Sequence, residues 1–177
     1  MAGYAFRDSA AAARRLAMVA AAFEPSSRAF LERFAGGTPG LAVDLGCGPG
    51  HTTLLLDEVE EIHTDHPVLR AYLDAVAKLL AMRGQRLEVG RLLEGLSDPG
   101  DLRRADSRVV SLSPPTALVG EMFGMNLTVW RDDPLAAEVA TPAVLDEIAA
   151  GLGALARVEE PAAITWRLRQ LAFERPQ

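Results

Sequence analysis

Cysteine, aromatic residues and long apolar runs are scarce in this chain of 177 residues. Cys47 is its only cysteine and aromatic side chains make up 6% of it. A single cysteine excludes an internal disulfide and is compatible with a reducing compartment. No apolar run approaches the length of a membrane-spanning helix, and the N-terminal residues, with Arg14 and Arg15 among alanines, lack the apolar core of a signal peptide. We therefore expect a cytoplasmic protein that does not bind membranes.

The chain also has fewer basic than acidic residues. Lys and Arg number 18 against 24 Asp and Glu, which gives a formal net charge of −6. This balance favours solubility and argues against broad nucleic-acid binding. Hydrophobic residues make up 49% of the chain, an ordinary share for a globular protein, and the length is sufficient for one core. We expect a single domain over residues 1–177.

The most informative segment is residues 41–50, which read L-A-V-D-L-G-C-G-P-G. A short apolar run indicates a buried strand over 41–45. The glycines that follow allow a tight turn and the close approach of a ligand, and the residues after His51 are typical of a helix start. A strand, a glycine turn and a helix N-terminus together form a nucleotide-type pocket. A strand, turn and helix without a ligand is the alternative.

These ten residues resemble, without a gap, the first motif of class I S-adenosylmethionine-dependent methyltransferases, whose consensus is close to V-D-L-G-C-G-P-G. The resemblance implies an α/β, Rossmann-like methyltransferase fold, S-adenosylmethionine as cofactor and a small-molecule methyl acceptor. It assigns no catalytic residue. In the family, the acid of this motif engages the donor. His51 follows the last glycine and could touch the donor or substrate, or be an exposed histidine in the first turn of the helix. The cofactor-binding residues it implies are Asp44, Gly46, Cys47, Gly48, Gly50 and His51.

The chain departs from the family after residue 53. The family's second strand, with its ribose-binding acid, and the third and fourth strands have no counterpart here. Residues 54–60 resemble the family's fifth strand and residues 61–67 the loop after it. Three missing strand–helix units correspond to roughly 80–100 residues. We therefore expect a truncated central sheet, although residues 52–62 could instead form the helix after the glycine turn.

The remaining patterns predict extra helices around this sheet. The N-terminal helices of residues 1–36 are expected over 10–23 and, after a break at Pro25, from Ser26 or Ser27 onward. A helical lid insert over 66–100 holds the clearest helix, from Pro67 to Gly84, and a shorter helix over 87–96. A strand is expected over 108–112. Helices should begin at residue 114 and, capped by Thr141, at residue 142.

The last expected strand covers residues 164–173. Trp166 and Leu168 alternate there with Thr165 and Arg167, which is typical of a strand with one wet face. Sheet edges left exposed by the truncation could pair with a partner chain, so a homodimer is an open alternative.

Other residues allow two interpretations each. Residues 63–66 read H-T-D-H, but the spacing matches no zinc pattern, so we expect no metal and assign Thr64 or Asp65 as a helix cap. The same loop would border the substrate pocket if the family pattern holds. Arg15 could pair with the donor's carboxylate or lie on a solvated helix face. An apolar pocket or a core could be formed by Met122, Phe123 and Met125.

Two functions follow from these patterns. The first is a methyltransferase that transfers a methyl group from S-adenosylmethionine to a small molecule. The second is a catalytically inactive, internally deleted remnant or interaction protein, because the ribose-binding acid and the adenine-binding strands are missing. Substrate identity lies beyond the sequence, since specificity resides in pocket shape.

Overall fold

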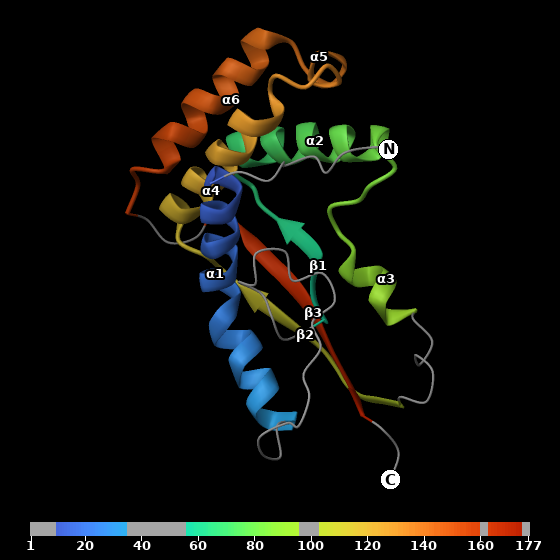
Figure 1. Cartoon of the computed structure of the whole chain (residues 1–177). Helices are drawn as coiled ribbons and strands as arrows, with labels where there is room; N and C mark the ends of the chain where they lie inside the picture. The colour runs from blue at the N-terminus through green and yellow to red at the C-terminus, as the bar shows by residue number, and fades with distance from the viewer. Residues whose placement is uncertain (1–9, 35–55, 96–102, 160–162, 175–177) are drawn as a thin grey trace. The chain divides into compact units, whose positions relative to one another are not determined.

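The computed structural model describes residues 10–34, 56–95, 103–159 and 163–174. These ranges hold six helices and three strands, so the protein is mixed α/β (Figure 1). The chain divides into two compact units. Unit 1 comprises residues 1–18, 63–87 and 113–165, and unit 2 comprises residues 19–62, 88–112 and 166–177. Each unit is therefore assembled from segments that are distant in the sequence.

The three-stranded sheet consists of β1 (Leu56–His63), β2 (Arg103–Leu112) and β3 (Thr165–Glu174), in the order β1-β3-β2. The last strand in the sequence thus lies in the centre. β3 is antiparallel to β2, with Trp166 opposite Leu112 and a register shift between Arg104 and Asp106. β1 and β2 point in the same direction (Figure 1), and parallel strands need a long connection, which here contains α2 and α3.

The structure of β1 shows whether its segment is a strand or a helix, the two interpretations that the sequence left open. The described part, from Leu56, is a strand, so the strand interpretation is confirmed there and the helix over 52–62 is wrong for these residues. The strand also continues to His63, where we expected a loop from residue 61. The reason is the pairing with β3, since a strand persists where a neighbour satisfies its backbone groups.

Helix α1 (Ala10–Phe34) contradicts the expected break at Pro25, because that residue lies inside one continuous helix. Proline removes one backbone hydrogen bond and crowds the preceding turn, which normally interrupts a helix. Packing on both sides of Pro25 opposes that effect. The Phe23 ring meets Trp166 edge-on with centroids 5.8 Å apart, and Phe30 is completely buried. Tertiary packing therefore outweighs the local break.

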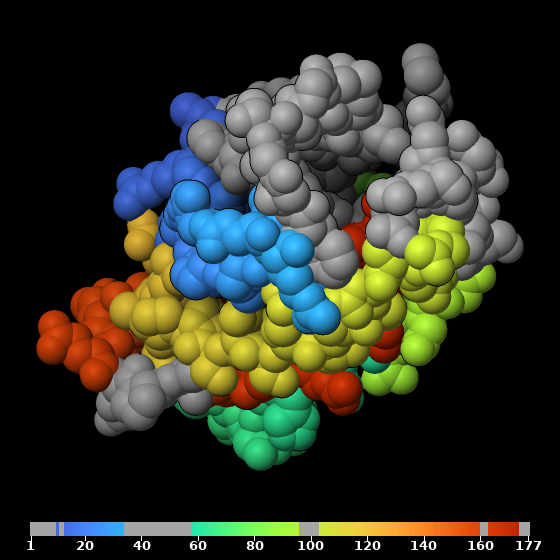
Figure 2. Space-filling view, turned by 90° about the horizontal axis from the view of Figure 1, so that it is seen from below, coloured from blue at the N-terminus to red at the C-terminus, as the bar shows by residue number. Residues whose placement is uncertain are grey.

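The C-terminal half of α1 covers one face of the sheet. Figure 2 shows α1 in blue lying against β2 in yellow. Arg108 of β2 lies 4.4 Å from the centroid of the Phe30 ring and donates to the Ser26 carbonyl at 3.2 Å. Its Nε also donates to Oε1 of the fully buried Gln170 at 2.8 Å. The buried amide on the central strand is therefore satisfied by a side chain from the neighbouring strand.

Besides the first turns of α1, unit 1 contains α2 (Pro67–Met82), α4 (Thr116–Trp130), α5 (Ala136–Val139) and α6 (Pro142–Leu155). The expected start of α2 at Pro67 is confirmed, and the helix ends just before Gly84, whose φ is 69°. The predicted cap of α6 is also confirmed, because the Thr141 hydroxyl accepts from the Val144 N–H at 3.4 Å. The apolar face of α2 is buried at Leu69, Tyr72, Ala75, Val76, Leu79 and Leu80.

The core of unit 1 is packed closely enough to require a small residue on α4. A Cβ at Gly120 would lie 2.5 Å from the Ala156 nitrogen and 2.8 Å from the Leu152 oxygen. The Tyr72 and Phe123 rings stack with centroids 4.4 Å apart. Met122 and Phe123 are buried, which supports the core interpretation for both, whereas Met125 is half-buried.

Candidate functional site

The glycine motif lies outside the described residues. This holds for strand 41–45 and for the whole implied cofactor-binding set, so their assignment stays a prediction: Asp44, Gly46, Cys47, Gly48, Gly50 and His51. The described residues nevertheless form two buried polar groups, one in each unit.

The first group lies inside unit 1 and combines a cation, a phenol, an amide and an indole. Arg15 of α1 is 8% exposed, so the solvated-face interpretation of this residue is wrong. Tyr72 comes from α2, and Asn126 and Trp130 lie one turn apart on α4; all three are buried. The sequence pattern did not identify Asn126, because a polar residue within an apolar run such as α4 gives no periodic signal of its own.

Burial raises the pKa of the Tyr72 phenol above its ordinary value. The side chains of Asn126 and Trp130 and the charge of Arg15 oppose this shift without cancelling it. The phenol is therefore neutral at physiological pH and can donate or accept a hydrogen bond, but it cannot serve as an anionic base.

We predict that Tyr72 makes the protein sensitive to alkali. Because its pKa is higher in the folded than in the unfolded state, the folded protein is favoured fully below about pH 10, the ordinary tyrosine value, and loses stability above it. Urea unfolding at pH 9 and pH 11 should show this loss, and Tyr72→Phe should reduce it. An equal loss in both proteins would contradict the assignment.

One atom of this group has unused hydrogen-bonding capacity. Asn126 Oδ1 is buried and has no hydrogen-bond partner among the described residues, whereas the Trp130 side chain is a hydrogen-bond donor to the Tyr72 hydroxyl. Buried polar atoms are normally paired with protein or ordered water. The free Asn126 oxygen beside the Tyr72 hydroxyl can therefore accept a hydrogen bond from a buried water molecule.

The H-T-D-H loop is organised by Thr64. Its hydroxyl donates to the Ala163 carbonyl at 2.6 Å and accepts from the His66 N–H at 3.1 Å. Asp65 pairs with Arg70 at 3.1 Å, and His66 is the N-cap of α2 without a side-chain cap bond. The assignment of Thr64 or Asp65 as the cap is therefore wrong, because both side chains are engaged elsewhere. No cluster of potential metal ligands occurs in the described ranges.

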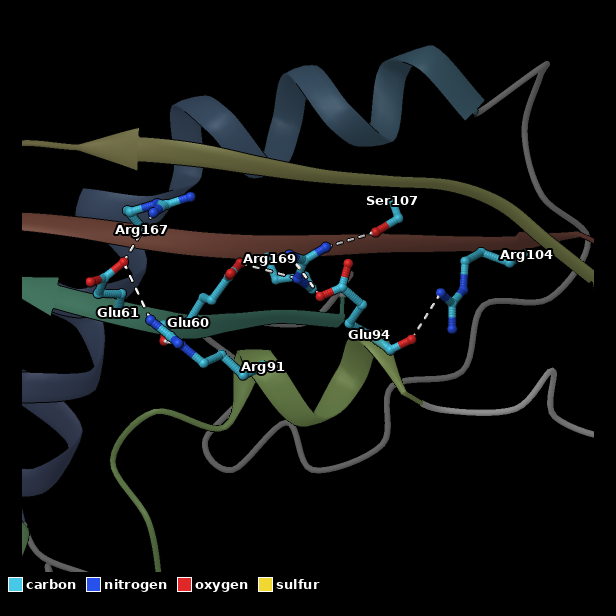
Figure 3. Close-up of polar contacts among 8 residues, drawn as sticks. All are labelled: Glu60, Glu61, Arg91, Glu94, Arg104, Ser107, Arg167 and Arg169. Carbon is cyan, nitrogen blue, oxygen red and sulfur yellow. Dashed lines mark hydrogen bonds and ion pairs between the residues drawn. The ribbon is translucent and has the colours of Figure 1, made fainter.

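The second group surrounds Arg169 on the central strand of unit 2 (Figure 3). Arg169 is 7% exposed, and its guanidinium lies 3.0 Å from the carboxylate of Glu60, which is 9% exposed. The same guanidinium donates to the Ser107 hydroxyl at 3.1 Å and lies 3.5 Å from Glu94. One side chain thus connects all three strands and α3 (Gly90–Glu94).

The alternation expected for the last strand is confirmed only in part. Trp166 and Leu168 are buried and Arg167 is exposed, as expected. By alternation, Arg169 should lie on the same solvent-exposed face as Arg167. It is buried instead, because Glu60 supplies a counter-charge from the neighbouring strand. The acidic residues of β1 were the signal that could have identified this pair.

Comparison with known proteins gives no relative: no family, curated protein or solved structure matches the chain. Among the described helices, none has both the length and the apolar character needed to cross a membrane.

Proposed function

We propose that this chain is an S-adenosylmethionine-dependent methyltransferase that transfers a methyl group to a small molecule. The single observation that carries the proposal is the segment 41–50, in which Asp44 is followed by alternating glycines. Glycines permit close backbone approach to a ligand, and an acid at the end of a strand can accept hydrogen bonds from it.

The arrangement of the strands supports this proposal. The segment that resembles the family's fifth strand is β1, and the C-terminal segment joins it in the same sheet.

Methyl transfer of this kind needs little side-chain chemistry. The sulfonium cofactor supplies an electrophilic methyl group when bound, so the protein has chiefly to orient the acceptor and exclude water.

A second candidate function is a remnant that no longer binds the donor. The sequence lacks the acid that would bind the ribose, and only three strands occur in the described residues. Further strands would have to pair with an outer edge of this sheet, and residues of α3 lie along the outer edge of β1. This observation favours a chain that has adapted to a smaller sheet.

Calorimetric titration with S-adenosylhomocysteine distinguishes the two functions. We expect the parent chain to bind and Asp44→Ala to bind about 10- to 100-fold more weakly, the effect of losing hydrogen bonds to a charged group. Asp132→Ala removes an exposed acid from the turn that follows α4 and should leave the affinity unchanged. Absence of heat at millimolar ligand would leave only the remnant.

A further inference from the structure

The buried hydroxyl of Tyr72 is a hydrogen-bond acceptor whose own hydrogen must also be satisfied. The side chains of Asn126 and Trp130 both form hydrogen bonds with it that lower the pKa of the phenol. Such bonds are donated to the phenol oxygen, because a donor favours the charged form. The Asn126 amide N–H and the Trp130 indole N–H are therefore the donors, and the Tyr72 O–H still needs an acceptor.

Asn126 Oδ1 is a buried acceptor in the same place. The Asn126 side chain is 8% exposed, and within the described ranges its oxygen has no hydrogen-bond partner. This oxygen cannot accept directly from the phenol while the amide N–H donates to it, because the two ends of one planar amide point in different directions. A donor and an acceptor therefore lie close together, and each lacks a partner.

Rotation of the Asn126 amide does not remove this shortage. The oxygen would then accept from the Tyr72 O–H, but the amide nitrogen, with its two N–H groups, would take the position without a partner. An unpaired buried donor costs free energy as an unpaired buried acceptor does. The rotation thus exchanges one unsatisfied group for another, and a further molecule is needed to satisfy both.

The rings around these groups hold them in place and shield them from bulk solvent. The Tyr72 ring stacks on Phe123 with centroids 4.4 Å apart, and its centroid lies 6.4 Å from that of Trp130. All three aromatic side chains are buried. Single water molecules are typically retained inside proteins where buried polar groups of this kind have no other partner.

We propose that one internal water molecule bridges Tyr72 and Asn126 in the core of unit 1. The water accepts a hydrogen bond from the Tyr72 O–H and donates one to Asn126 Oδ1, so a single molecule satisfies both groups. It connects α2 to α4, and it can exchange with bulk solvent only when the core opens. The water is structural and takes no part in the proposed methyl transfer.

Magnetic relaxation dispersion of the water oxygen nucleus counts long-lived internal water molecules and tests this assignment. Tyr72→Phe and Asn126→Leu nearly preserve side-chain volume, and each should reduce the count by one relative to the parent. Thr128→Val is the matched control, because this exposed residue lies on the same helix and its hydroxyl donates to the Gly124 carbonyl. It should leave the count unchanged. The same count in the parent, Tyr72→Phe and Asn126→Leu would overturn the proposal.

Two further measurements keep the test decisive. With the water in place, Asn126→Leu removes satisfied hydrogen bonds and should lower the melting temperature by several degrees. An unchanged or raised melting temperature would contradict the proposal, because the leucine would then have replaced an unsatisfied acceptor. A crystal structure of the parent needs no variant. It should show ordered solvent within about 3.2 Å of both Tyr72 Oη and Asn126 Oδ1, and its absence there would refute the bridge.

Discussion

Replacing Arg169 with methionine should lower the free energy of unfolding by about 3–5 kcal/mol, the usual effect of removing one partner of a buried ion pair. The loss arises because the Glu60 carboxylate, which is 9% exposed, would remain buried without its positive counter-charge. The change also removes the hydrogen bond to Ser107, and with it a connection between β3 and β2. Urea unfolding followed by circular dichroism measures the effect.

The neighbouring Arg167 provides the control for this prediction. Arg167 lies on the same strand as Arg169 and pairs with Glu61 of β1 at 3.0 Å, but its side chain is 46% exposed. Arg167→Met should therefore cost less than about 1 kcal/mol. Combining Arg169→Met with Glu60→Leu removes both charges and should recover most of the loss. Equal destabilisation by Arg169→Met and Arg167→Met would show that the buried pair carries no special stability.

Replacing Gly120 with alanine should destabilise unit 1 by about 1–3 kcal/mol or more, the range for overpacking a core. The new methyl group would lie 2.5 Å from the Ala156 nitrogen and 2.8 Å from the Leu152 oxygen. Both atoms belong to the backbone of α6 and its C-terminus, so they cannot move aside as a side chain does. Helices α4 and α6 would have to separate, which would loosen the surroundings of Asn126 and Trp130. Thermal unfolding measures the stability.

Gly124 lies one turn further along α4 and is the matched control. No atom lies within 4 Å of a Cβ built there, so Gly124→Ala should be neutral or stabilise the helix by up to about 1 kcal/mol, the difference in helix propensity. A loss of stability in Gly124→Ala equal to that in Gly120→Ala would attribute the effect to α4 itself rather than to its contact with α6.

Hydrophobic spacing was sufficient to locate the elements whose burial is periodic. Leu69 to Leu80 gave the face of α2, Thr141 and Pro142 gave the start of α6, and Trp166 with Leu168 gave the buried face of β3. Local signals failed at Pro25, where a residue that usually ends a helix is retained within α1. The packing of Phe23 against Trp166, far away in the sequence, has no counterpart in a local pattern.

The candidate sites divide in a similar way. Residues 41–50 can be identified as a motif from the sequence alone, because a glycine turn after an apolar run is a local arrangement. The groups around Tyr72 and Arg169 are not, because each combines residues from at least three elements. The burial of Arg15 and Arg169 was also not expected from their residue type, since charged residues are rarely buried unless they are paired.

By itself, the sequence determined the mixed α/β class, the helical segments after β1 and β2, and the glycine motif, because these depend on the spacing of residues along the chain. Only the tertiary structure decided that β3 lies between β1 and β2, that Arg169 is buried, and that residues of α3 lie along the outer edge of β1. Each of these depends on pairing between residues far apart in the sequence, and such pairing is fixed by the free energy of the whole fold.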